Sequence, residues 1–548
     1  MFSCLLAATV AYGVNAHICG KWEEPSRTTA EIRTAGFGAV RADFCWGDVE
    51  KKAAPGVFDF SKWDDIVAKA AQNGVQVLPT TGWGPVDPVA NPERWAEYLR
   101  RFVSRYRAQM PVIEIWNEEN VSGFWKDPNP TNYVQALKTA YRTIKAVDPS
   151  VRVSFGGTSG VPLDYIEEAY RNGAKDFFDI MAVHPYSHPY QPEKTLDVRL
   201  EKLRELMAKY GDAEKPVWIT ELGMPTIGSR PNDADSLVER MEQFLGRAKP
   251  WRCAYIHCGN IDSTDPIKAY LVKMPKGSTG YTLHPDEAAE KLRTEDYDAV
   301  FYGGYYYDPT ALDAVLAFVA KGGVMVAHGG PTMKTAWKWN PMRPGLSLLG
   351  EKYDEAKDRA RLDAAVKAGG RVVLSSRYHD CDNFSDEYHQ ALYLPRMMGL
   401  AFAEGVEAFY IYEFRQPDRK DGDRESYFGI VHDNFAPTPA FGSVRTFIAA
   451  RPEGSVRKKA AWHSANREVF YPQWTCPDGQ PGGMLWTTRE PFEKELRFTT
   501  DRVVFTDYRG YRIWTKPGNG NAYRLRISGE PVYFKGGELL AREEAGRR

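Results

Sequence analysis

The sequence predicts an α/β protein in three parts: a parallel (β/α)8 barrel, a smaller α/β domain inserted into it, and a C-terminal antiparallel β-sandwich. Two patterns predict this. Short apolar, β-branched runs alternate with amphipathic helical runs over residues 13–223 and again over 253–375. After residue 450 the pattern changes to short alternating runs between glycine and proline turns, which is typical of antiparallel strands.

The first region contains seven expected strands, separated by amphipathic helices such as one that places Trp95, Leu99 and Phe102 on one face. These strands are too apolar to have a solvated face, so we expect a parallel sheet that helices cover. Seven strand-and-helix units indicate a (β/α)8 barrel that lacks its eighth unit in this region. The strands are Gly13–Ile18, Ala39–Phe44, Val75–Thr80, Val112–Glu118, Val151–Gly157, Asp179–Tyr186 and Val217–Gly223.

The barrel is interrupted after its seventh strand by a segment too long for a structureless loop. This insert has its own alternation of strands and helices, which predicts a three-layer α/β domain. Its expected strands are Cys253–Cys258, Asp298–Tyr302, Val324–Ala327 and Val372–Ser375, and its expected helices are Pro285–Arg293, Pro309–Ala320 and Tyr353–Ala368.

The eighth barrel unit follows the insert, as a helix at Asp386–Gly405, a strand at Glu407–Arg415 and a last helix at Phe441–Ala450. We therefore expect the barrel at residues 1–224 and 385–450, the insert at 225–384 and the sandwich at 451–548. The expected sandwich strands include Arg502–Asp507, Tyr511–Trp514, Tyr523–Ile527 and Val532–Phe534.

The charge balance and the cysteines exclude some classes of protein. With 71 basic and 72 acidic residues the net charge is −1, so a nucleic-acid or anionic membrane partner is not expected. No apolar stretch reaches the roughly 20 residues of a membrane span, which predicts a soluble protein. The seven cysteines form neither a disulfide framework nor paired metal-ligand motifs. The first residues, MFSCLLAATVAYGVNAHI, are either a signal-peptide remnant or strand, and a periplasmic or secreted location is favoured over the cytoplasm.

Two glutamates follow apolar strands directly. Glu118 ends the run PVIEIWNE and Glu221 ends VWITE, so both side chains are expected at the carboxyl ends of their strands, where α/β proteins hold their chemistry. Each alone could be an ordinary surface glutamate. Facing each other at about 5 to 5.5 Å, they could cleave a glycosidic bond with retention of configuration. Glu119 competes with Glu118, but neighbours on an extended chain point in opposite directions, so Glu119 is expected to point away.

Three motifs in the same order resemble a known family. Trp116-Asn117-Glu118, His184-Pro185-Tyr186 and Thr220-Glu221 resemble strands four, six and seven of clan A glycoside hydrolases, and within that clan family 39, which includes xylosidases and iduronidases. The insert is similar in kind to the flavodoxin-like or amidotransferase-like domain of family 42 galactosidases, where it helps to form trimers. A dimer or trimer formed through the insert is therefore a further expectation.

The resemblance implies a retaining glycoside hydrolase that cleaves an oligo- or polysaccharide without a cofactor or metal. It implies that Glu118 is the acid/base and Glu221 the nucleophile, and the negative charge on Glu221 is expected to raise the pKa of Glu118. It assigns Asn117 to the hydroxyl beside the anomeric carbon, and Arg41 and Tyr186 to the orientation of the nucleophile. Arg41 could instead form a structural ion pair with Asp43 or Glu50.

Further residues at or just after strand ends are candidate sugar contacts, and each could instead have a packing role. His184 is expected to line the cleft, although a histidine on a strand is often a satisfied core residue. Glu413 and Arg415 could pair with each other, whereas an anionic sugar would favour such an arginine. The candidates are His17, Trp46, Trp83, Trp125, His184, Glu413 and Arg415.

Two alternatives to hydrolysis remain open at this stage. A transglycosylase would use the same residues, with an acceptor sugar in place of water. A carbohydrate-binding protein without activity could keep the scaffold, although both carboxylates are present. The sequence does not decide between exo- and endo-cleavage.

Overall fold

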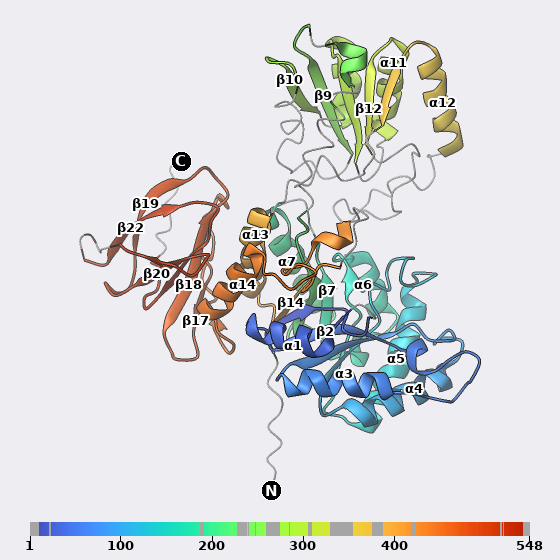
Figure 1. The fold of residues 1–548 in the computed structure, drawn as a ribbon, viewed down its shortest axis with the longest axis vertical. Helices are drawn as coiled ribbons and strands as arrows, with labels where there is room; N and C mark the ends of the chain where they lie inside the picture. The colour runs from blue at the N-terminus through green and yellow to red at the C-terminus, as the bar shows by residue number, and fades with distance from the viewer. Residues whose placement is uncertain are drawn as a thin grey trace. The chain divides into compact units, whose positions relative to one another are not determined.

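The computed structural model describes residues 10–20, 23–186, 191–226, 238, 241–246, 248–258, 274–283, 285–304, 309–328, 355–374, 387–417, 424–515, 518 and 520–540. The chain divides into two compact units (Figure 1). The first unit contains residues 1–187, 192–225 and 387–548, and the second contains residues 188–191 and 226–386.

A parallel sheet in the order β5-β4-β3-β2-β1-β14-β8-β7-β6 forms the centre of the first unit. Its edges meet through a parallel bridge between Ser154 and Ile180, which closes the barrel. The predicted fold class is therefore confirmed. The strands are β1 (Tyr12–Asn15), β2 (Ala39–Cys45), β3 (Gln76–Gly82), β4 (Val112–Ile115), β5 (Arg152–Ser154), β6 (Thr158–Ser159), β7 (Met181–His184), β8 (Val217–Leu222) and β14 (Ala408–Ile411).

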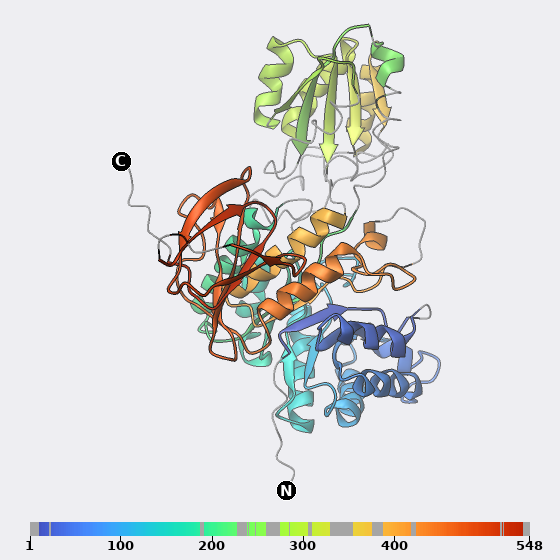
Figure 2. The same cartoon turned by 60° about the vertical axis from the view of Figure 1, so that its left-hand side comes forward.

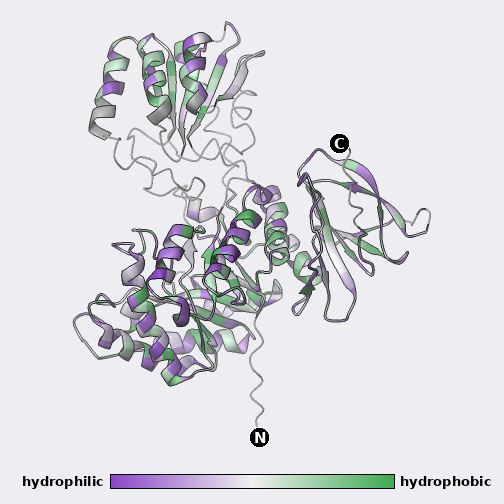
Figure 3. Ribbon diagram, turned by 180° about the vertical axis from the view of Figure 1, so that it is seen from behind, coloured by the Kyte–Doolittle hydropathy of each residue, from purple (hydrophilic) through white to green (hydrophobic). Residues whose placement is uncertain are grey.

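Amphipathic helices surround this sheet. In α4, residues spaced three or four apart, such as Trp95, Leu99 and Phe102, are buried against it, as the sequence predicted. Figure 3 shows the helices banded in hydrophilic and hydrophobic colours. The helices are α1 (Pro25–Thr34), α2 (Trp46–Val49), α3 (Ser61–Gln72), α4 (Pro92–Tyr106), α5 (Pro130–Val147), α6 (Leu163–Arg171), α7 (Leu196–Lys209), α13 (Glu387–Ala403) and α14 (Pro439–Ala450), with short 3-10 turns η1 (Lys175–Phe177), η2 (Pro192–Lys194) and η3 (Arg424–Tyr427).

The second unit has a five-stranded parallel sheet in the order β10-β9-β11-β12-β13. In chain order this is 2-1-3-4-5, the order of flavodoxin-like domains, which are one of the two kinds of domain that the insert was expected to resemble. The strand β10 was not among the predicted strands. Separate apolar clusters lie on its two faces, which makes three layers. The elements are β9 (Arg252–Cys258), β10 (Thr279–Leu283), α10 (Pro285–Thr294), β11 (Ala299–Gly304), α11 (Pro309–Ala320), β12 (Val324–His328), α12 (Glu355–Lys367) and β13 (Arg371–Leu374).

The C-terminal strands are all antiparallel. They pack beside α14 in both views (Figures 1 and 2), where the ring of Phe447 contacts Trp474 and Tyr533. The indole of Trp486 on β18 adds to this junction by donating to Glu193 (2.6 Å), which also pairs with the buried Arg396. The strands are β15 (Val456–Arg457), β16 (Val469–Phe470), β17 (Gln473–Thr475), β18 (Pro481–Thr487), β19 (Phe492–Arg497), β20 (Val504–Asp507), β21 (Arg512–Ile513), β22 (Ala522–Ile527) and β23 (Val532–Lys535).

Two further observations bear on the sequence analysis. In the part of the chain that the structure describes, no helix has both the length and the apolar composition needed to cross a bilayer. Cys19, Cys45, Cys253 and Cys476 are free cysteines.

Candidate active site

The chain leaves the sheet sharply after β4, and this change of direction presents the first carboxylate. Trp116 and Glu118 have positive φ angles of 76° and 46°, a left-handed conformation that side chains other than glycine adopt only when the surrounding structure holds them there. Because the segment is not extended, the neighbouring residues Asn117 and Glu118 both reach the same site. The predicted strand Val112–Glu118 is therefore too long by its last residues.

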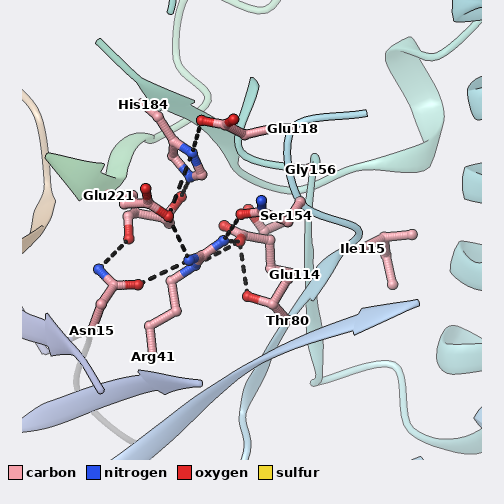
Figure 4. Close-up of polar contacts among 12 residues, drawn as sticks. Asn15, Arg41, Thr80, Glu114, Ile115, Glu118, Ser154, Gly156, His184 and Glu221 are labelled. Carbon is pink, nitrogen blue, oxygen red and sulfur yellow. Dashed lines mark hydrogen bonds and ion pairs between the residues drawn. The ribbon is translucent and has the colours of Figure 1, made fainter. Parts of the chain in front are cut away.

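The two predicted carboxylates meet at the carboxyl ends of their strands, with a histidine beside them (Figure 4). Single side-chain atoms of Glu118, His184 and Glu221 all lie within 4.8 Å of one another. One carboxyl oxygen of Glu118 therefore lies within 4.8 Å of one of Glu221, an approach compatible with the approximately 5 to 5.5 Å between the carboxyl groups of retaining glycosidases.

Arg41, on β2, links the carboxylate of Glu221 to the core of the barrel. Its Nη1 donates to Glu221 Oε2 (3.1 Å) and to Asn15 Oδ1 (2.8 Å). Its Nη2 donates to Asn117 Oδ1 (2.7 Å), and its Nε donates to Glu114 Oε1 (2.8 Å). Since the Asn117 oxygen accepts from Arg41, the amide of Asn117 has its NH2 group left to donate to a ligand.

The ionic partners of Arg41 are Glu114 and Glu221, and not Asp43 or Glu50. Arg41 and Glu114 are both buried, and the shortest distance between them, from Nη2 to Oε1, is 2.6 Å. Glu50 instead accepts from Arg94 and from the indole of Trp46. A buried arginine between two carboxylates provides a fixed positive charge beside the site.

Glu221 has a second, neutral donor on its other oxygen. The hydroxyl of Tyr186 donates to Glu221 Oε1 at 2.8 Å. Burial raises the pKa of Glu221 above its ordinary value, while Arg41 and Tyr186 act in the opposite direction because both stabilise the ionised carboxylate. The carboxylate is thus oriented through both of its oxygens.

His184 is fully buried between Glu118 and Thr220. Its Nδ1 lies 3.0 Å from Glu118 Oε1 and its Nε2 lies 3.1 Å from Thr220 Oγ1. Burial lowers the pKa of His184 to about 4, although the negative Glu221 opposes this shift, so the ring is neutral near pH 7. If the hydroxyl of Thr220 donates to Nε2, the proton on Nδ1 is directed at Glu118.

A pocket of about 390 Å³ opens at the ends of β1, β2 and β14, and His17 and Glu413 are among its lining residues. The Nε2 atom of His17 lies 3.2 Å from Glu413 Oε2. Burial alone would lower the pKa of His17, but the contact with Glu413 outweighs it and raises the pKa to about 9. Asp43 and Tyr412 also line the pocket. Among the described lining residues, none is a lysine or an arginine.

The three tryptophans predicted to contact sugar differ in burial and in packing partners. Trp46 has an exposed fraction of 0% and stacks on Tyr98 in the core, so the prediction that it contacts sugar is wrong. Trp125 is also buried and packs against Trp116, with 4.5 Å between the ring centroids. Trp83 is half-buried and also packs against Trp116, with 5.4 Å between the ring centroids.

Arg415 and Glu413 point to different partners. Arg415 pairs with Glu23 (3.3 Å) and donates to the carbonyl of Asp433. Its guanidinium also lies over the ring of Phe435. These contacts give Arg415 a packing role, and Glu413 faces His17.

Glu119, the competitor of Glu118, lies away from the site as expected. It is fully buried, and neither of its carboxyl oxygens has a hydrogen-bonded partner from another described residue. Burial raises its pKa well above the ordinary value, so the group is held in its neutral form. A neutral buried acid behind β4 contributes no charge to the site.

Sequence reasoning missed three residues of the network: Asn15, Glu114 and Thr220. Asn15 donates to the backbone carbonyls of Thr220 and Ile411, which ties β1 to the strands that close the barrel. Glu114 had a detectable signal, because it is a charged residue inside the apolar run PVIEIW. Nothing in the sequence pairs it with Arg41.

Glu118, His184 and Glu221 also present the atom types that could hold a divalent cation. The carboxylate of Glu221 already accepts hydrogen bonds from Arg41 and Tyr186. A fixed guanidinium at 3.1 Å opposes a second cation at the same carboxylate. The arrangement therefore suits proton transfer and nucleophilic attack better than metal binding.

Comparisons with known proteins show which families the chain is similar to. Residues 8–250 match the family model for cellulase (glycosyl hydrolase family 5). The first seven strands of the barrel are therefore similar to those of a glycoside hydrolase of clan A. A β-xylosidase of Geobacillus stearothermophilus is 26% identical to this chain over 132 residues, a segment that spans 22% of this chain and only 26% of that enzyme.

Two solved structures share the fold of this chain. One is a family 39 glycoside hydrolase from the gut symbiont Bacteroides cellulosilyticus WH2, with a TM-score of 0.53 and 16% identity, covering 96% of this chain and 80% of the other. The second is a family 30 endoxylanase from Clostridium papyrosolvens C71, with a TM-score of 0.52 and 11% identity, covering 96% of each chain.

Proposed function

We propose that the protein is a retaining glycoside hydrolase that cleaves an oligo- or polysaccharide by double displacement. The observation that carries the proposal is the approach of Glu118 and Glu221 to within 4.8 Å at the open end of the barrel. Two carboxyl groups that approach each other this closely can act on opposite sides of one anomeric carbon, as a retaining reaction requires.

In this proposal Glu221 is the nucleophile and Glu118 is the acid/base. Arg41 and Tyr186 both donate to Glu221, which supports an ionised carboxylate aimed at the anomeric carbon. The negative charge on Glu221 in turn favours the protonated form of Glu118 until the leaving group departs. After the glycosyl enzyme forms, Glu118 accepts a proton from the attacking water.

Asn117 and His184 have supporting roles. The NH2 group of Asn117 is proposed to donate to the sugar hydroxyl beside the anomeric carbon, a contact that strengthens in the transition state. Neutral His184 is proposed to hold Glu118 through Nδ1. β-Xylosides are the first substrates to test, because the curated relative is named a β-xylosidase.

The test uses azide with two alanine variants. Glu221→Ala should lose turnover of an aryl glycoside, and added azide should restore it with a glycosyl azide of inverted configuration as the product. Glu118→Ala should lose about 10²- to 10⁴-fold on poor leaving groups and far less on activated ones. Exchanged behaviour of the two variants would contradict the assignment of roles.

The same assay addresses the transglycosylase alternative. Adding an acceptor sugar and analysing the products would reveal transfer in place of hydrolysis. Oligomer formation through the insert, and a periplasmic or secreted location, stay predictions.

A further inference from the structure

A short exposed segment of the C-terminal sandwich combines aromatic rings and guanidinium groups. The turn between β20 and β21 and the residues that follow it read Tyr-Arg-Gly-Tyr-Arg-Ile-Trp. We call Tyr508, Arg509, Tyr511, Arg512 and Trp514 the aromatic strip. Trp514 is 81% exposed and Tyr511 is 67% exposed, and both are among the most exposed large apolar side chains of the described residues.

The turn that carries the strip is held in one conformation. The carboxylate of Asp507 accepts from the backbone amides of Arg509 (2.9 Å) and Tyr511 (2.9 Å). The backbone amide of Asp507 also donates to the carbonyl of Tyr511 (2.8 Å). Gly510, at a φ of 91°, takes the left-handed position that such a turn requires. A preorganised surface of this kind loses less entropy when a ligand binds.

The arginines lie over the rings. The guanidinium of Arg512 lies 4.2 Å from the ring centroid of Trp514, and that of Arg509 lies 5.4 Å from the centroid of Tyr511. Arg509 is neutralised by Asp507, at 2.8 Å. Arg512 has no carboxylate within 4 Å among the described residues. Arg512 therefore places a positive charge next to an exposed indole, while Glu530 places a second carboxylate near Tyr508 and Arg509 at the other end of the strip.

The strip begins at the catalytic end of the barrel. Tyr508 packs edge-on against Tyr388, in the first turn of α13, with 6.4 Å between the centroids. Two residues further along α13, Gln390 donates to the backbone carbonyls of Met224 and Phe428, which follow β8 and β14. Because chains leave a parallel barrel at the carboxyl ends of the strands, this end of α13 lies on the same side as the two glutamates.

We propose that the aromatic strip binds an acidic polysaccharide, a glycan whose sugar units carry carboxylates, away from the point of cleavage. Aromatic side chains present flat apolar surface to the apolar faces of sugar rings. A guanidinium pairs with a carboxylate through two parallel hydrogen bonds. Single exposed apolar residues need no explanation, but the alternation of rings and guanidinium groups over seven residues matches such a chain. The inference goes beyond the proposed hydrolysis and does not require it.

Binding of the full chain to a matched pair of polymers tests this inference. The probes are a glucuronic-acid-substituted xylan and the same polymer after reduction of its carboxyl groups, studied by affinity electrophoresis in a Glu221→Gln background so that neither probe is consumed. Trp514→Ala should raise the Kd for the acidic polymer about three- to tenfold. Arg512→Ala should weaken binding of the acidic polymer but leave binding of the reduced polymer unchanged, and the difference should shrink with added salt.

Controls come from exposed residues outside the strip. Tyr281→Ala removes an exposed tyrosine that also has an arginine over its ring, and Arg524→Ala removes an exposed arginine of β22. Neither should change the Kd. With Glu221 intact, Trp514→Ala should turn over a small aryl glycoside at the wild-type rate, so that a failed hydrolase assay and a failed binding assay remain separate results.

Three results would overturn the inference: equal affinity of Trp514→Ala and its parent, equal affinity for the acidic and reduced polymers, or concentration-dependent self-association that Trp514→Ala abolishes. The last result would assign the strip to contact between copies of this chain. Sedimentation of both proteins over a range of concentrations detects it.

Discussion

The Nδ1 atom of His184 lies 3.0 Å from Oε1 of Glu118 and 3.8 Å from Oε2 of Glu221. One neutral imidazole therefore lies next to both proposed catalytic carboxyls without adding a charge to either. Its other nitrogen faces Thr220, so the orientation of the ring is fixed from both sides. The predictions below follow from this arrangement and from the buried groups around it.

The pH dependence of stability should report the buried state of His184. Its pKa of about 4 in the folded protein lies below the ordinary 6.5, so the stability from the neutral ring is fully present above pH 6.5. This contribution to the free energy of unfolding is about 3 kcal/mol, and it is lost as the pH falls from 6.5 through about 4. Urea unfolding at pH 7 and pH 4.5 should show a smaller acid loss for His184→Gln than for wild type. An identical acid loss in the two proteins would argue against a neutral, buried ring.

Gly157 should be required for the position of His184. A Cβ atom at residue 157 would lie 2.0 Å from His184 Nε2, so Gly157→Ala must displace the imidazole from Glu118. We expect kcat to fall at least tenfold, with a pH profile altered on the limb that reports the acid/base. Gly123→Ala is the matched control, because its Cβ would meet nothing within 4 Å. If both variants keep wild-type kcat, the ring does not position Glu118.

Arg41 should matter for both stability and catalysis. Arg41→Lys cannot reproduce four separate contacts, and it leaves the buried carboxylate of Glu114 poorly paired. We expect unfolding free energy to fall by about 3 to 5 kcal/mol. The control is Arg105→Lys, whose pair with Asp64 is exposed on both sides and should cost at most about 1 kcal/mol. Denaturant unfolding measures the free energy of unfolding of both variants. Equal losses in Arg41→Lys and Arg105→Lys would contradict the importance of burial at Arg41.

Glu119→Gln should stabilise the protein and leave activity intact. The pKa of Glu119 is raised in the folded protein, so the stability of its neutral form is present below the ordinary pKa and declines as the pH rises above it. The amide removes this decline, and the variant should unfold at a higher urea concentration than wild type at pH 8. Glu118→Gln, one residue earlier, should instead lose turnover. Loss of activity in Glu119→Gln with retention in Glu118→Gln would reverse the assignment of the acid/base.

The strand pattern predicted the barrel because buried parallel strands must be apolar along their whole length. The same reasoning missed β10, because its sequence Thr-Gly-Tyr-Thr-Leu contains only two large apolar residues. Its place in the sheet depends on its pairing with β9, which its composition does not indicate. The reasoning also extended the strand before Glu118 too far, since no residue in Trp116-Asn117-Glu118 signals a left-handed backbone.

At the site, the sequence predicted which residue types gather at strand ends but not which way each side chain points. Trp46 follows β2 directly, yet the short helix α2 turns its ring inward onto Tyr98. The pairing of Arg41 with Glu114 was equally inaccessible, because it joins two strands through the barrel interior. The residues chosen from the three motifs do lie together, because Asn117, His184 and Tyr186 contact Arg41, Glu118 and Glu221.

The register of β1 has a consequence for synthesis of the chain. Tyr12 pairs with Phe409 and Val14 with Ile411, so the ring of strands stays open until the ribosome has made the insert and the strand beyond it. Until then the strands β1 and β8 are without their common neighbour β14, so one backbone edge of each is unpaired. We expect the nascent barrel to depend on chaperones over this interval, while the insert, whose sheet pairs only within itself, can fold first.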